Sequence, residues 1–116
     1  MRIRIRDLAK LQPDKMAKIA LAATPRALLD LYCVAPGQEQ KPHTHGDQDK
    51  FYVVLEGRGR FRLGAAEHAL EAGDALVAPA GVEHGLVNDG DARRSVMRAA
   101  AVASPGRRRA DVRLRR

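Results

Sequence analysis

Three of the four histidines in this sequence lie in two short segments whose spacing suits metal binding. His43 and His45 are two residues apart, and His84 follows the turn sequence at residues 79–81. Residues i and i+2 of a strand point to the same face, so the first two imidazoles are expected to share one cavity as the chain enters a strand over residues 51–55. Imidazoles bind Fe, Mn, Ni, Cu and Zn. The pattern predicts one divalent metal ion held by His43, His45 and His84.

The remaining reactive side chains are interpreted more simply. A His-x-His pair alone can equally be solvated or hydrogen-bonded, and it is the grouping of three histidines that favours a metal. The fourth, His68, is flanked by Glu67 and Glu71 and is expected at the surface. Cys33 is the single cysteine, which excludes an internal disulfide, and we expect it to be a small buried apolar residue.

Short strands separated by Gly, Pro, Asn and Asp must position these side chains. This rhythm is typical of an all-β sandwich or barrel, and no long amphipathic helix interrupts it. The predicted strands cover residues 2–6, 19–23, 27–34, 51–55, 60–63, 67–71, 75–78, 84–87 and 93–102.

The length and charge indicate one domain with a basic end. The chain has 116 residues and a formal net charge of +7, and six of its arginines lie among residues 107–116. We therefore predict a single domain over residues 1–104 and a basic, solvated tail over residues 105–116. The tail lacks interleaved aromatic residues, which argues against a nucleic-acid partner. No secretory signal and no apolar run long enough to span a bilayer is found, so a cytoplasmic protein without a membrane partner is expected.

Two motifs resemble those of the cupin superfamily. The first joins Gly37, His43, His45 and Gly57. The second matches the family at each fixed position, which are Gly73, Pro79, Gly81, His84 and Asn88. The resemblance implies an antiparallel jelly-roll β-barrel of six to eight strands. It also implies a metal on the three motif histidines and a homodimer built through terminal strands.

Lys50 departs from the family pattern, which places a Glu ligand at this position. An ammonium held about 4 Å from a divalent ion is repelled by on the order of 8 kcal/mol at an effective dielectric constant of about 20, so Lys50 cannot replace the carboxylate. The carbonyl oxygen of Gln48 would complete the site, or a β-bulge would turn Asp47 or Asp49 inward. Alternatively, the imidazoles bind the metal with water, while Lys50 turns away or meets an anionic substrate. A barrel without metal is the fourth outcome.

These residues predict a metalloenzyme that acts on a small molecule, of the dioxygenase, isomerase or lyase type. Lys50 and Tyr52 are the predicted substrate contacts, because strand alternation places both on the inward face. The alternative for Tyr52, and the commoner role of an inward tyrosine, is to fill part of the barrel. The alternative is a non-catalytic barrel that binds or senses a small molecule.

Overall fold

A computed structural model describes residues 1–44, 46–90 and 96–104. Within these ranges the chain forms nine strands and one helical turn, α1 (Ile5–Leu8). The strands are β1 (Ala17–Ala23), β2 (Leu28–Val34), β3 (Glu39–His43), β4 (Lys50–Glu56), β5 (Arg58–Leu63), β6 (Ala66–Glu71), β7 (Ala75–Ala78), β8 (His84–Val87) and β9 (Met97–Ala103).

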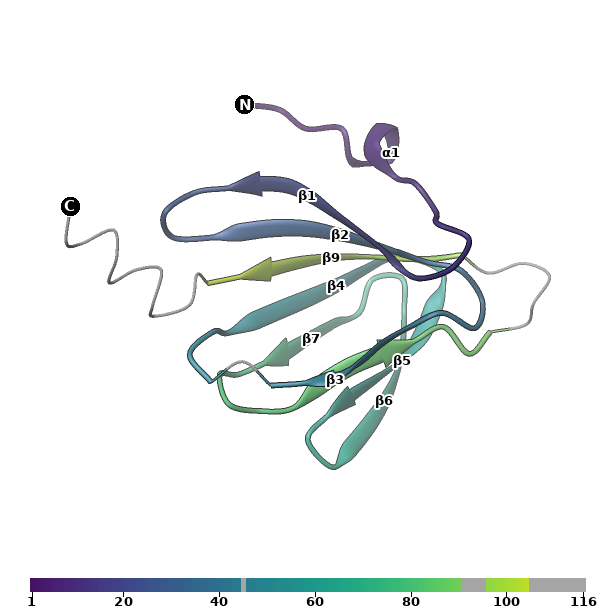
Figure 1. The fold of residues 1–116 in the computed structure, drawn as a ribbon, viewed down its shortest axis with the longest axis vertical. Coiled ribbons are helices and arrows are strands. Elements are labelled where there is room, and N and C mark those ends of the chain that lie inside the picture. The colour runs from purple at the N-terminus through teal and green to yellow at the C-terminus, as the bar shows by residue number, and fades with distance from the viewer. Residues whose placement is uncertain (45, 91–95, 105–116) are drawn as a thin grey trace.

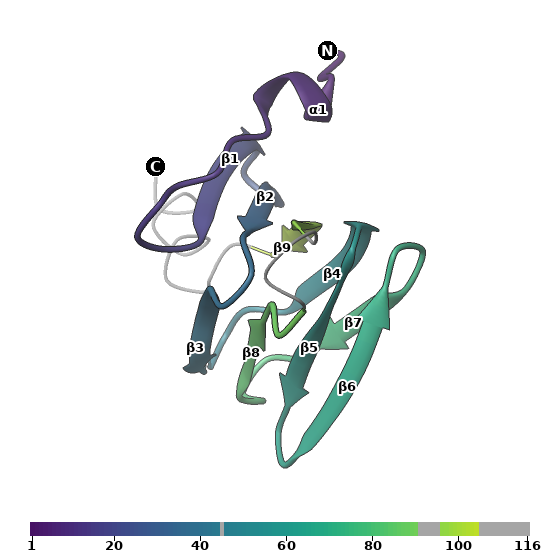
Figure 2. The same cartoon turned by 90° about the vertical axis from the view of Figure 1, so that its right-hand side faces the viewer.

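The strands form two antiparallel sheets that face each other (Figures 1 and 2). One sheet has the order β1-β2-β9-β4-β7, and the other has the order β3-β8-β5-β6. No hydrogen-bonded strand pair joins the two sheets in the part of the chain that the structure describes, so the barrel is open at its sides. The prediction of an all-β antiparallel fold is confirmed.

The core lies between the sheets because the strands alternate in burial. On β4, Lys50, Tyr52 and Val54 point inward, whereas Phe51 and Val53 are exposed on the outer face. Each fully buried large apolar side chain contributes about 1.5–3 kcal/mol of transfer free energy. The buried members of this core are Tyr32, Val34, Tyr52, Val54, Phe61, Leu76, Leu86, Met97, Ala99 and Ala101.

A row of small side chains runs along β9, in the middle of the five-stranded sheet. Ala99, Ala101 and Ala103 are buried, and each pairs with one residue of β2 and one of β4. Ala101, for example, stands between Asp30 and Tyr52. The methyl groups leave space for the longer side chains on either side, which is how two tyrosines and a lysine fit inside.

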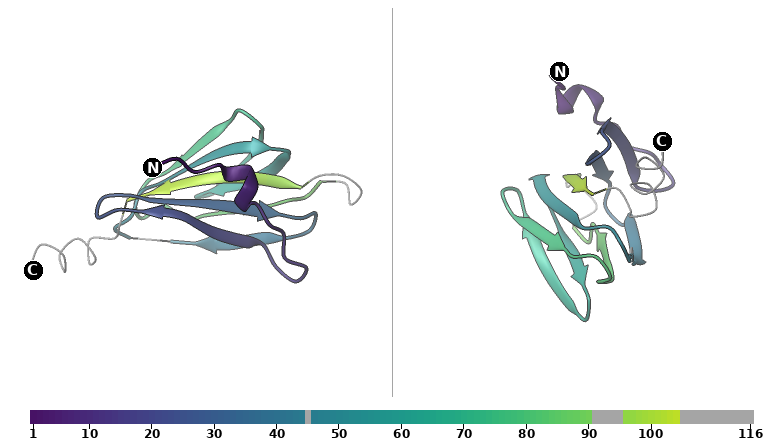
Figure 3. Two further views of the ribbon diagram at one scale, coloured as in Figure 1. Left: turned by 90° about the horizontal axis from the view of Figure 1, so that it is seen from above. Right: turned by 90° about the vertical axis from the view of Figure 1, so that its left-hand side faces the viewer.

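The N-terminal segment differs from its prediction. Residues 2–6 were expected to form a strand, but Ile5 begins α1, which lies outside the five-stranded sheet beside β1 (Figure 3). Ile5 and Ala9 are four residues apart, as on one face of a helix, and both pack against the cluster that contains Leu31 and Cys33 on the outer face of β2. The segment therefore covers part of this sheet instead of extending it. Cys33 is buried there, as predicted.

Two further expectations concern the chain ends and a missed strand. β3 was not predicted, and it forms an edge of the four-stranded sheet. The predicted strand over residues 93–102 is present from Met97 onward, and residues 91–95 and the tail at 105–116 lie outside the described residues. The described part contains no helix with the length and apolar character needed to span a bilayer.

Candidate functional site

Strand pairing brings His43 and His84 together. The two residues are direct partners in the antiparallel β3–β8 ladder, and their ring centroids are 4.4 Å apart. The close approach depends on Gly85, because a Cβ there would lie 2.7 Å from the carbonyl oxygen of Gln40. His43 therefore belongs to its own strand in the four-stranded sheet. The expectation that it enters the strand of residues 51–55 is wrong, since the unpredicted β3 intervenes.

Backbone hydrogen bonds fix the form of both imidazoles. Nδ1 of His43 lies 3.1 Å from the carbonyl oxygen of Lys41, and Nδ1 of His84 lies 3.0 Å from that of Val82. A carbonyl oxygen only accepts, so each Nδ1 carries a proton and donates it. In the neutral ring the lone pair then lies on Nε2, and this tautomer binds a metal through Nε2. The two side chains fit a divalent ion in their chemistry and their proximity.

The other predicted ligands are placed less favourably or lie outside the described residues. His45 is outside them. Gln48 is half-buried and precedes the first residue of β4. Asp47 and Asp49 are exposed, and Asp49 accepts a hydrogen bond from the Ala80 N–H at 2.9 Å. The bulge that would turn either carboxylate inward is not seen. Residues 1–44, 46–90 and 96–104 contain no group of three His, Cys, Asp or Glu that could hold a metal.

Lys50 points into the barrel and is turned toward β2. Its side chain is 4% exposed, and Nζ donates a hydrogen bond to the hydroxyl of Tyr32. The ammonium lies 4.9 Å from the ring centroid of Tyr32 and 5.3 Å from that of Tyr52, which are cation–π distances. Burial, assisted by the nearby charge of Lys18, lowers the pKa of Lys50 to about 8. The amine is therefore mostly protonated at pH 7.

Tyr52 connects Lys50 to the histidines. Its hydroxyl donates to Oε1 of Gln40 at 3.0 Å, and its ring centroid lies 6.1 Å from that of His84. Burial raises the pKa of the Tyr52 hydroxyl well above its ordinary value and that of Tyr32 to about 12, so both remain proton donors. Tyr32 and Gln40 were not singled out in the sequence. They come from β2 and β3, and only the strand register brings them to Lys50 and Tyr52.

Asn88 connects the two sheets, and His68 lies at the surface as expected. Asn88 is fully buried, and its Nδ2 donates to the Val34 carbonyl at 2.9 Å while its Oδ1 accepts from the Gly90 N–H at 3.0 Å. It joins the end of β8 to β2 across the two sheets and is structural. His68 is exposed on β6.

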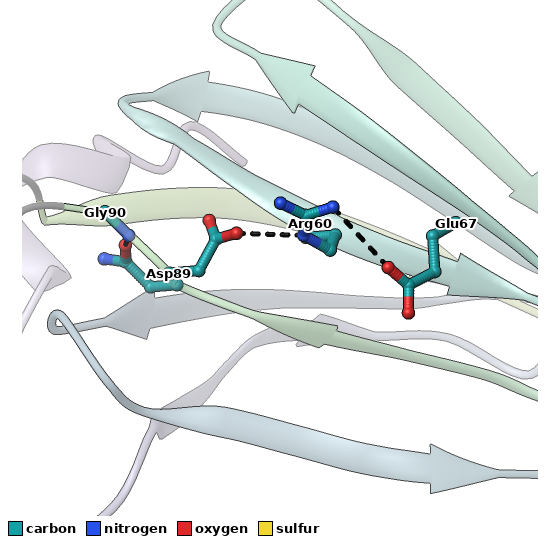
Figure 4. A network of polar contacts seen from close by, with 5 residues as sticks. Arg60, Glu67, Asp89 and Gly90 are labelled. Carbon is teal, nitrogen blue, oxygen red and sulfur yellow. Dashed lines mark hydrogen bonds and ion pairs between the residues drawn. The ribbon is translucent and has the colours of Figure 1, made fainter.

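Two surface hollows are present, and neither is lined by a histidine. One of about 500 Å³ is lined by β5, β6 and the residues after β8, and one of about 140 Å³ lies over Gly85 and its neighbours. Arg60 borders both, and it pairs with Asp89 at 2.9 Å and Glu67 at 3.6 Å (Figure 4). Neither hollow is lined by His43, His84 or Lys50. The hollows therefore do not mark the candidate site, which is defined by the interior side chains of His43, His84, Lys50 and Tyr52.

The comparisons with known proteins agree with this architecture. The sequence matches the cupin domain model over residues 30–97. The protein TT1209 from Thermus thermophilus is 42% identical, and the match covers 90% of this chain and 98% of that one with a TM-score of 0.84. No curated protein matches the sequence.

Two more distant structures share the fold. An uncharacterized conserved protein with a double-stranded β-helix domain, from Klebsiella pneumoniae subsp. pneumoniae MGH 78578, is 21% identical; the match covers 91% of this chain and 90% of that one, with a TM-score of 0.82. KdgF from Halomonas sp. is 24% identical, with coverage of 87% and 90% and a TM-score of 0.74. The predicted jelly-roll architecture is confirmed, although the described residues form nine strands and not the six to eight that the resemblance implies.

Proposed function

This chain belongs to the cupin family, and from that premise we propose that it is a small metal-binding cupin that works as a metalloenzyme on a small molecule. The reaction would be of the dioxygenase, isomerase or lyase type. The observation that carries the proposal is the His43–His84 pair, whose rings meet across β3 and β8 with each Nδ1 donating to a carbonyl. This arrangement prepares both Nε2 atoms as ligands.

His43, His45 and His84 would hold the metal, and Gln48 would complete its coordination. These three imidazoles and the amide oxygen are all neutral ligands, so none of them would offset the positive charge of the cation. When bound, a divalent ion acts as a Lewis acid or redox centre toward the substrate.

The residues around the histidines would bind and orient the substrate. Lys50 offers a positive charge from β4, and Tyr52 offers a protonated hydroxyl that Gln40 already holds in place. The apolar core around these groups excludes water, which strengthens their electrostatic contacts with a bound molecule.

Metal analysis of the purified protein tests the proposal. We expect a stoichiometric divalent ion by inductively coupled plasma mass spectrometry, and its loss in His84→Ala. His68→Ala is the matched control, because His68 is exposed on β6, and it should keep the metal. Equal metal content in the three proteins would contradict the assignment of His84.

A non-catalytic cupin that binds a small molecule is the second candidate. It is favoured by Lys50, whose ammonium stands where the family pattern has an acidic ligand. The two candidates differ in their need for metal. Oxygen uptake or substrate turnover that disappears when the metal is removed supports the enzyme, whereas ligand affinity that survives metal removal supports the binding module.

A further inference from the structure

The inside of the barrel holds a positive charge that the described residues do not balance. Lys50 is the only lysine, arginine, aspartate or glutamate that is buried in residues 1–44, 46–90 and 96–104. No carboxylate oxygen in those ranges lies within 4.0 Å of its Nζ. A buried ammonium is costly unless a counter-charge and hydrogen bonds compensate it. Here the described residues supply a hydrogen bond to the Tyr32 hydroxyl and the faces of the Tyr32 and Tyr52 rings, but no counter-charge.

The carboxylate whose charge acts on Lys50, that of Asp30, is already engaged by another cation. Asp30 attracts Lys50 weakly, but its Oδ2 pairs with Nζ of Lys18 at 3.9 Å. Lys18 also lies over the Tyr32 ring, at 6.0 Å from its centroid. Two ammonium groups and one carboxylate thus surround Tyr32, which leaves one net positive charge. A bound divalent ion at the histidines would make the interior more positive still.

The unbalanced charge and the imidazole pair both lie next to the Tyr52 ring. Its centroid is 5.3 Å from Lys50 Nζ and 6.1 Å from the His84 centroid. On β9, the partners of Lys50 and Tyr52 are Ala103 and Ala101, so the neighbouring wall is formed by methyl groups. Because these distances are short, a molecule that reaches from Lys50 to the histidines must be small.

We propose that the barrel interior binds a small carboxylate, with one carboxylate oxygen on Nζ of Lys50 and the rest of the molecule extending past Tyr52 toward His43 and His84. The assignment of the far end rests on the proposed function, whereas the charge at Lys50 does not depend on a metal. A carboxylate carries a single negative charge, which matches the one ammonium of Lys50, and it can accept a hydrogen bond from the hydroxyl of Tyr52. A phosphate carries more charge and is usually met by arginine forks or several backbone N–H groups.

Calorimetric titration at pH 7 and constant ionic strength tests this with three probes of known chemistry. Malonate is the carboxylate, malonamide is its neutral counterpart of similar shape, and inorganic phosphate is the competing anion. We expect malonate to bind, and malonamide and phosphate to bind at least roughly tenfold more weakly, the equivalent of about 1.4 kcal/mol. Lys50→Met should lose a similar factor of the malonate affinity, whereas Lys10→Met, which removes an exposed lysine, should keep it.

A second substitution, Lys50→Gln, guards against a folding defect in Lys50→Met, and circular dichroism checks both. Equal malonate affinity in wild type and in a folded Lys50 variant would overturn the proposal, as would absence of malonate binding or equal binding of phosphate. The metal content of the same samples separates the two proposals. If malonate binds through Lys50 in a protein that contains no metal, only the proposed metal centre is refuted. If the protein contains metal and does not bind malonate, only the proposed carboxylate site is refuted.

Discussion

The side chain at position 50 shows how strand geometry and residue chemistry act separately. The alternation along β4 turns this position inward whatever residue occupies it. The family pattern has a carboxylate there, and this chain has an amine that must find neutral partners in the same space. It finds them in the hydroxyl of Tyr32 and the faces of two aromatic rings. The ammonium is thereby drawn to β2.

The buried amine predicts a distinctive pH dependence of stability. The pKa of Lys50 is about 8 in the folded protein and 10.5 as a free side chain, so the unfolded chain binds more protons between these values. Below pH 8 the buried amine therefore lowers the free energy of unfolding by its full amount, up to about 3 kcal/mol. This loss disappears as the pH rises toward 10.5. We expect Lys50→Met to be more stable than wild type at pH 7, by a margin that narrows by about pH 9.5.

Urea denaturation of both proteins at several pH values from neutral to alkaline measures this margin. The tyrosines are the same in both proteins, so their titration cancels in the difference. A margin that stays constant over this range would show that Lys50 titrates normally.

Spacing identified part of the site but not its partners. His43, His84, Lys50 and Tyr52 stand out because motif position and alternation can be read along one segment. Tyr32 and Gln40 could not be found in this way, since a tyrosine within an apolar run and a glutamine before a histidine are ordinary. Their contacts depend on the register of β2 and β3 against other strands, and the sequence does not encode that register locally.

At the scale of elements, the close contact of β3 with β8 is set by one residue without a side chain. A Cβ on Gly85 would also meet Pro42, with N at 2.9 Å and Cα at 3.0 Å, and all of these atoms belong to the β3 backbone. Backbone atoms cannot turn aside as a flexible side chain does. The two strands would have to separate, and His43 and His84 would separate with them.

Gly85→Ala is therefore expected to destabilise the protein by about 1–3 kcal/mol, as overpacking commonly does, and to weaken metal binding. Gly46→Ala is the matched control, because a Cβ at Gly46 meets nothing within 4 Å. Urea denaturation and metal titration of both variants check the prediction. Unchanged stability and metal affinity in Gly85→Ala would mean that β3 does not position His43.

The elements that were predicted well are those with a regular apolar pattern. The hairpin of β1 and β2 and the strands β4 to β8 follow from alternation and turn residues. β3 was missed because Glu39–His43 is polar and contains Pro42, which suits an edge strand but gives no apolar signal. The N-terminal error arose because Ile3 and Ile5 alternate like a strand, while packing of Ile5 and Ala9 on the sheet favours a helical turn.

At the scale of the whole molecule, the outer face of the five-stranded sheet is apolar beyond the area that the N-terminal segment covers. Phe51 pairs with Val77 on β7 and with Val102 on β9, and all three side chains are exposed. Val53 and Leu55 continue this surface along β4. A contiguous apolar area of this kind marks an interaction site, and a second copy would present the same area to it. The homodimer implied by the family stays a prediction that this surface supports.

Phe51→Lys should shift the protein from dimer to monomer, because it places a charge in the middle of this area. Light scattering coupled to size-exclusion chromatography measures the mass directly. Leu11→Lys is the control, since Leu11 is equally exposed but lies in the N-terminal segment. A monomeric wild type, or a dimer that tolerates both changes, would contradict the prediction. The single domain over residues 1–104 and the solvated tail also stay predictions.

The alanines of β9 affect how large a molecule the interior could bind. They carry no reactive group, yet Ala99, Ala101 and Ala103 are flanked on both neighbouring strands by the longer side chains of the interior. The room around Lys50 and Tyr52 thus depends on β9, a strand that contributes no reactive side chain. Replacing Ala101 or Ala103 by leucine would place a larger side chain beside Tyr52 or Lys50 without changing an imidazole or the amine. Substitutions on β9 can therefore change the room around Lys50 and Tyr52 while the reactive groups stay the same.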